Sequence, residues 1–66
     1  MVDKMKVVVG DEVQVLDTSN GKLLEAFVRR LDKGKIEVYV TRFKNTMWFD
    51  EAGKTRLGRF QFQGRP

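Results

Sequence analysis

The residues best suited to bind a charged partner lie close together in the last third of the chain. Residues 41–62, TRFKNTMWFDEAGKTRLGRFQF, interleave five cationic side chains with aromatic and aliphatic ones. Cationic side chains neutralise phosphates, and aromatic rings stack on nucleobases. This pattern predicts a non-enzymatic binding surface, with DNA or RNA ranked ahead of protein as the partner. Sheet and core residues with solvated charges are the alternative interpretation of the same stretch.

The candidate nucleic-acid or partner-binding residues are the cations of the second half of the chain and the aromatic side chains expected at the surface. They are Arg29, Tyr39, Arg42, Phe43, Lys44, Trp48, Lys54, Arg56 and Arg59. Residues 1–28 carry a net charge of −2 and residues 29–66 carry +6, which together give the total of +4. Such asymmetry is typical of proteins that meet nucleic acid, an anionic membrane or an acidic protein.

A second hypothesis makes the same molecule a protein-binding module. Phe27 alternates with the apolar residues on its predicted strand, so its ring is expected on the outer face, where a large apolar side chain needs a partner. Tyr, Trp and Arg are enriched at the centres of protein interfaces. The candidate protein interface comprises Phe27, Arg29, Arg30, Tyr39, Met47 and Trp48. Homo-oligomerisation through this face is a third alternative.

Catalysis is not expected from the residues present. The chain has no Cys and no His, which removes the commonest metal ligands and the commonest proton carrier at neutral pH. The adjacent carboxylates at residues 11–12 and 50–51 would point to opposite faces of a strand, and Ser19 has no evident base. We therefore predict no catalytic residue, no metal site and no cofactor.

Short runs of alternating polarity, separated by glycine, predict an all-β fold. The expected strands are residues 6–9 resumed as 12–16, then 23–30, 35–41, 46–49 and 55–62. Asn20-Gly21 predicts a tight hairpin between the first two. Five short antiparallel strands leave few unpaired edges if they close into a barrel. We expect one domain over residues 1–66, with residues 63–66 as a frayed tail.

The predicted core follows from the alternation. Its members are Val7, Val13, Val15, Leu24, Ala26, Val28, Ile36, Val38 and Val40. At least some of the late aromatic residues must complete this core. The candidates are Phe43, Trp48, Phe49, Phe60 and Phe62.

Residues 9–40, VGDEVQVLDTSNGKLLEAFVRRLDKGKIEVYV, resemble the opening of an SH3-like β-barrel of the KOW or Tudor type. The resemblance rests on Gly10, Asp11, Val13, Gly21, Ala26 and Val28. It implies a five-stranded SH3-like barrel. A Tudor-like module would need an aromatic cage, and residues 17–23 supply no aromatic side chain to it. A KOW-like module would point to RNA or to the transcription and translation machinery, although Ala26 stands where that family usually has glycine.

Residues 39–58, YVTRFKNTMWFDEAGKTRLG, resemble small β-barrel proteins of tailed bacteriophages. The resemblance rests on Trp48, Phe49, Asp50, Gly53 and Lys54. It implies an accessory protein in the host cytoplasm that docks on a host enzyme or defence complex and modulates it. The apolar run within residues 1–10 is too short for a membrane span, so a cytoplasmic, non-membrane protein is expected.

Overall fold

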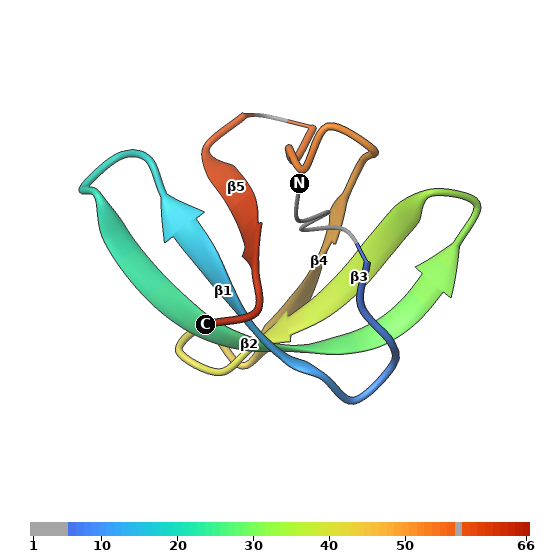
Figure 1. Ribbon diagram of the computed structural model, residues 1–66. Helices are drawn as coiled ribbons and strands as arrows, with labels where there is room; N and C mark the ends of the chain where they lie inside the picture. The colour runs from blue at the N-terminus through green and yellow to red at the C-terminus, as the bar shows by residue number, and fades with distance from the viewer. Residues whose placement is uncertain (1–5, 57) are drawn as a thin grey trace.

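The fold is a five-stranded antiparallel sheet that curls into a half-barrel (Figure 1). The computed structural model describes residues 6–56 and 58–66. The strands are β1 (Glu12–Asp17), β2 (Lys22–Asp32), β3 (Lys35–Val40), β4 (Asn45–Phe49) and β5 (Phe60–Gly64). Their order in the sheet is β4-β3-β2-β1-β5, so β2 is the central strand and β4 and β5 are the outer strands. The all-β, five-stranded prediction is confirmed.

The β1–β2 hairpin forms where Asn20-Gly21 predicts it. Gly21 adopts a φ of 71° and donates its N–H to the carbonyl of Asp17 at 2.8 Å. The side chain of Asn20 accepts the N–H of Lys22 at 3.0 Å, which fixes the far side of the turn. The resulting register places Val15 opposite Leu24, so both strands direct their apolar residues to the same face.

The sheet curls because β2 is long and irregular in its pairing. Val28 pairs with Val38, but Arg30 pairs with Glu37, so Arg29 forms a bulge in the central strand. A bulge bends its strand and increases the local twist. Figure 1 shows β2 sweeping from the β1–β2 turn, under the molecule, to the β2–β3 turn on the opposite side.

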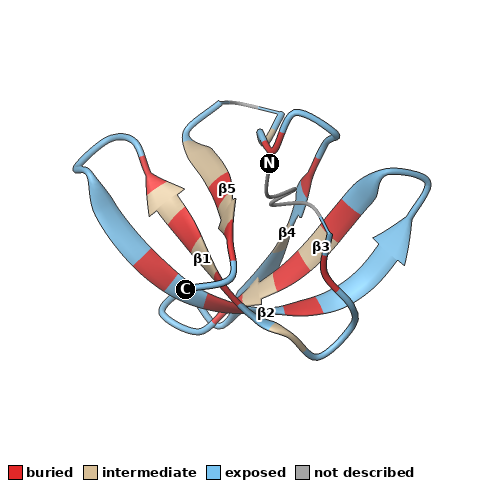
Figure 2. Ribbon diagram, viewed as in Figure 1, coloured by how far each residue is buried: buried red, intermediate tan, exposed pale blue. Residues whose placement is uncertain are grey.

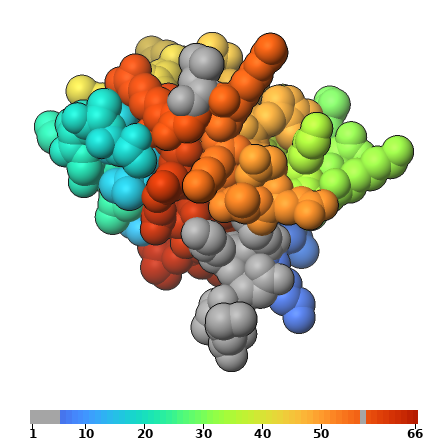
Figure 3. Space-filling model, turned by 90° about the horizontal axis from the view of Figure 1, so that it is seen from above, coloured from blue at the N-terminus to red at the C-terminus, as the bar shows by residue number. Residues whose placement is uncertain are grey.

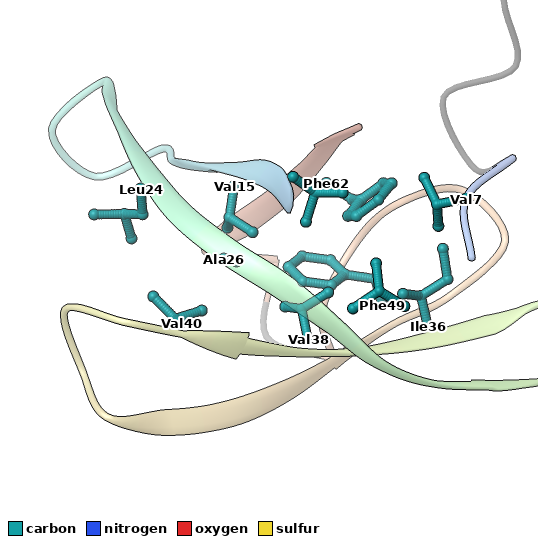
Figure 4. Close-up of a cluster of buried hydrophobic side chains, with 11 residues drawn as sticks. Val7, Val15, Leu24, Ala26, Ile36, Val38, Val40, Phe49 and Phe62 are labelled. Atoms are coloured by element: carbon teal, nitrogen blue, oxygen red, sulfur yellow. The ribbon is translucent and has the colours of Figure 1, made fainter. Parts of the chain in front are cut away.

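The concave side of this sheet holds the core. All nine residues predicted for the core are buried, and Phe49 and Phe62 join them (Figure 2). The rings of Phe49 and Phe62 meet with centroids 5.7 Å apart and planes inclined at 51° (Figure 4). Of the other late aromatics, Phe60 packs against the core while Phe43 and Trp48 remain exposed. Phe49 and Phe62 are therefore the aromatic residues that complete the core.

The two ends of the chain depart from the predicted strands. Residues 6–9 are not in a strand; instead the chain leading into β1 docks on β2 through the N–H of Gly10, which the carbonyl of Val28 accepts at 2.8 Å. The tail prediction is wrong for Gln63 and Gly64, which belong to β5. Gly64 pairs with Gln14, and the following Arg65 contacts Asp11 at 2.9 Å, so pairing with β1 holds this segment in place.

The last strand begins at Phe60 rather than at residue 55. The N–H of Gly58 bonds to the carbonyl of Thr55 at 3.0 Å, and the N–H of Thr55 bonds to the carbonyl of Phe60 at 3.4 Å. Gly58 has a φ of 75°, a conformation that favours glycine. Thr55 and Gly58 are therefore bonded across a turn, and Arg56 belongs to this turn instead of to a regular strand.

Replacing Phe62 by alanine should remove most of the stability of the fold. Phe62 is fully buried, and truncation of a buried Phe costs about 3–5 kcal/mol. A domain of this length has roughly 3–10 kcal/mol in total. We expect Phe62→Ala to be largely unfolded or to unfold at much lower urea concentration, as followed by circular dichroism. Leu23→Ala, at an exposed site, is the control, and equal losses in both variants would contradict this account of the core.

Candidate functional site

The two outer strands of the sheet approach each other through the loop between them. Lys54 forms a β-bridge with Gln61, and the N–H of Phe62 bonds to the carbonyl of Gly53 at 2.7 Å. The side chain of Asp50 organises this loop by accepting the N–H groups of Ala52 and Lys54 at 2.9 and 3.0 Å. The loop thus joins β4 to β5, the two outer strands of the half-barrel. We call the line along which these two strands face each other the seam, and a hollow lies farther along it.

This hollow, which we call the seam groove, has a volume of about 550 Å³. The described residues that line it come from β4, from the turn before β5 and from the first residue of β5. They are Met47, Trp48, Thr55, Arg56, Arg59 and Phe60. Three of the nine predicted binding residues, Trp48, Arg56 and Arg59, therefore meet at one place. In the view from above, the orange and red surface of residues 50–64 lies between the cyan β1–β2 turn and the green β2–β3 turn (Figure 3).

The walls of the seam groove are apolar and partly fixed. Met47 packs against the core while the neighbouring Trp48 is 38% exposed, as expected of successive residues on an edge strand. The rings of Phe60 and Phe43 meet edge to face at a centroid distance of 5.8 Å. The guanidinium carbon of Arg59 lies 5.0 Å from the centre of the Phe60 ring. These two contacts hold Phe60 in the wall.

Arg59 is held in turn by Asp17 at the end of β1. Its Nε donates to Oδ1 at 3.3 Å and its Nη2 donates to Oδ2 at 3.2 Å. Asp17 is only 3% exposed, and its Oδ1 also accepts the hydroxyl of Ser19 at 2.6 Å. The Ser19 hydroxyl, followed by Arg59, lowers the pKa of Asp17 from 3.8 to about 2. Arg59 is thus a fixed, charge-compensated part of the site.

A second, smaller hollow of about 320 Å³ adjoins the first through Arg59. Its lining includes Arg42 and Phe43 from the β3–β4 turn and Leu24 from β2. In the same turn, Lys44 adopts a φ of 51°. The ion pairs among the described residues are Arg59–Asp17 and Arg65–Asp11. The exposed cations Arg42, Lys44 and Arg56 belong to neither pair.

The remaining predicted residues lie elsewhere. Arg29 is the bulge residue of the central strand, Tyr39 is half-buried on β3, and Lys54 sits in the loop that bridges to Gln61. Neither these three nor Lys44 lines the two hollows, as far as the described residues show. The structure therefore divides the predicted set into five residues that line the two hollows and four that lie elsewhere.

The outer face carries part of the alternative protein interface. Phe27 is 40% exposed and stands directly opposite Tyr39 on the neighbouring strand. Glu37 pairs with Arg30 on one side and with Trp48 on the other. Met47 does not belong to this face, because it points toward the core.

Sequence reasoning did not assign Asp17, Thr55 or Phe60 to the site. Asp17 was placed in a turn, and its partner Arg59 is 42 residues away in the chain. Thr55 was placed in a regular strand, whereas its Oγ1 is buried without a hydrogen-bond partner in the part of the chain that the structure describes. The one local signal was the run of turn-forming residues 18–21 after Asp17, because an Asp at the start of a turn often accepts hydrogen bonds from the next residues.

The fold and the groove define a small all-β protein with a basic, aromatic hollow at the open seam of its sheet. No protein-family model, curated protein or solved structure matches the chain. Within residues 6–56 and 58–66 no cluster of three metal-ligating side chains occurs. Nor does this part of the chain contain a helix long and apolar enough to cross a membrane.

The bonds that the Asp17 carboxylate accepts from Ser19 and Arg59 predict a specific loss of stability in acid. Because the pKa of Asp17 is lowered in the folded protein, its contribution is complete above the unfolded value of 3.8 and disappears as the pH falls toward 2. Asp17→Asn should therefore be less stable than the native protein at pH 7, with a difference that shrinks between pH 5 and 2.

Urea unfolding at a series of pH values measures this difference directly. Asp32→Asn, at the exposed end of β2, is the matched control and should follow the native protein. If the gap between Asp17→Asn and the native protein stayed constant across this range, the ionised Asp17 carboxylate and its bonds to Ser19 and Arg59 would not be the cause.

Proposed function

We propose that this protein is a non-enzymatic module that binds nucleic acid through the seam groove and the adjoining β3–β4 turn. The observation that carries the proposal is the position of two exposed cations beside exposed aromatic rings: Arg56 lines the seam groove with Trp48, and Arg42 lines the adjoining hollow with Phe43. Unpaired cations attract phosphates, and exposed rings offer stacking surfaces to bases.

The residues have different roles in this proposal. Arg42 and Arg56 line the two hollows outside the described ion pairs, so they are the main phosphate-binding candidates, and Lys44 joins them from the same turn as Arg42. Arg59 is already compensated by Asp17, so it serves mainly as a wall of the groove. Arg29 and Lys54 contribute to the positive field at longer range, which raises the rate of encounter with a polyanion.

Two features support the finer proposal that the half-barrel is an SH3-like one. The segment containing Gly10 and Asp11 precedes β1 and bonds to Val28 of β2, joining the parts of the motif on which the resemblance rests. The five antiparallel strands are compatible with a small barrel. If the resemblance to bacteriophage proteins also holds, the module acts in the host cytoplasm.

The exposed outer face favours one second candidate, a protein-binding module. Phe27 and Tyr39 form a cross-strand pair of aromatic residues beside Arg29 and Arg30. Such a face fits a partner protein, or a second copy of this chain, better than a nucleic acid.

Charge reversal at Arg56 should separate these two candidates. We expect the native protein to bind short DNA or RNA with an affinity that falls steeply with salt, as measured by fluorescence anisotropy of a labelled oligonucleotide. Arg56→Glu should weaken binding by about tenfold or more and flatten the salt dependence.

Arg30→Glu provides the matched control, since Arg30 lies on the outer face opposite Glu37. It should leave nucleic-acid affinity within about threefold of the native value after allowance for the change in net charge. Absence of salt-sensitive binding to DNA and RNA at low salt would reject the proposed function. Arg59→Glu is unsuitable for this test because it would bring a second carboxylate to buried Asp17.

A further inference from the structure

The backbone groups on the β5 side of the seam groove are already engaged, and so is one N–H at the start of the β4 edge. Antiparallel pairing of β4 with β3 directs every second residue's backbone groups to the free edge. Thr46 faces that way, and its N–H bonds to Oδ1 of Asn45 at 2.8 Å. On the opposite side, the N–H of Phe62 bonds to Gly53 and the carbonyl of Phe60 accepts the N–H of Thr55. A peptide strand could therefore extend the sheet only along the short part of the β4 edge that includes Trp48.

The groove instead offers side chains. Trp48 and Phe60 supply aromatic surface, and Met47 supplies an apolar floor against the core. The volume of about 550 Å³ falls within the usual range for small organic ligands, roughly 300–1,000 Å³. Such a space suits a planar ring system of the size of a nucleobase, whereas the bases of an intact duplex are stacked on one another and keep their faces hidden.

Charge complementarity identifies the rest of the ligand. Arg56 lies at the groove, and Arg42 lines the adjoining hollow, which shares Arg59 with it. One cation at the groove and another at the adjoining hollow match a chain with a phosphate on each side of a base. Because Asp17 holds Arg59, and Arg59 with Phe43 holds Phe60, the aromatic wall is formed before the ligand arrives.

From these observations we infer that the seam groove takes one unpaired base of a single-stranded nucleic acid, stacked against Trp48, with flanking phosphates at Arg56 and Arg42. This inference rests on the proposed function and narrows it to single strands. The groove recognises the base by its aromatic face, so DNA and RNA are both accepted.

The experiment compares labelled oligonucleotides of about 8 nucleotides, a length within the 4–16 that small barrels cover. The probes are oligothymidine, the same oligomer lacking its bases, and a duplex of equal length. We expect oligothymidine to bind at least about tenfold more tightly than the duplex and than the base-free chain, and to quench the fluorescence of Trp48.

Variants at Trp48 test the stacking contact. Trp48→Ala should weaken binding of oligothymidine by roughly 5- to 150-fold and leave binding of the base-free oligomer unchanged. Trp48→Phe should restore much of the affinity. Phe27→Ala, which removes a similarly exposed aromatic residue from the outer face, is the control and should have little effect. Circular dichroism of each variant verifies that it is folded.

Each alternative outcome has a distinct meaning. Equal affinity for single strands and duplex, or an unchanged affinity of folded Trp48→Ala together with a loss in Arg56→Glu, would overturn this inference and leave nucleic-acid binding intact. Failure of all three probes to bind at low salt would reject both. Equally tight binding of an oligoglutamate of matched charge would overturn the base-stacking site in favour of an acidic peptide.

Discussion

The contact between Phe49 and Phe62 determines how this small sheet can close. The two residues lie on the two outer strands, which are joined by the loop at residues 50–54 and by packing of their rings across the core. Hydrophobic contact has little directional requirement, so it can draw two strands together without bringing their backbones into register. The seam therefore stays open beyond the loop, and the groove is a direct result of closing the barrel with side chains.

The ion pair between Arg59 and Asp17 has a similar organising effect at the other end of β5. It joins the residue before β5 to the last residue of β1, and the hydroxyl and N–H of Thr18 also bond to the carbonyl of Arg59 at 2.6 and 2.9 Å. These contacts set where β5 begins, and hence on which side of the sheet Phe60 lies. The stability of the fold and the shape of the candidate site therefore both depend on the contacts that Arg59 makes with Asp17 and Thr18.

The sequence was sufficient for the parts of the fold that depend on local patterns. Alternation in β1, β2 and β3 identified every aliphatic core residue of these three strands, and Asn20-Gly21 located the first hairpin. It was insufficient for β5, because two apolar residues at alternate positions fix the face of a strand but not its starting point. For the site, the sequence predicted which residue types take part but not how they come together. Trp48, Arg56 and Arg59 meet because the chain turns at Gly58 and because Arg59 is bonded to Asp17, which lies 42 residues away.

The bond from Thr46 to the side chain of Asn45 also bears on the behaviour of the protein in concentrated solution. β4 is an outer strand that carries Met47, Trp48 and Phe49 in succession, the kind of segment that recruits identical strands into aggregates. Asn45 occupies an amide at the start of this edge, and the loop at residues 50–54 lies at its other end, with Asp50 bonded to Lys54. The molecule can therefore expose an aromatic outer strand while offering a growing fibril only a short length of free backbone.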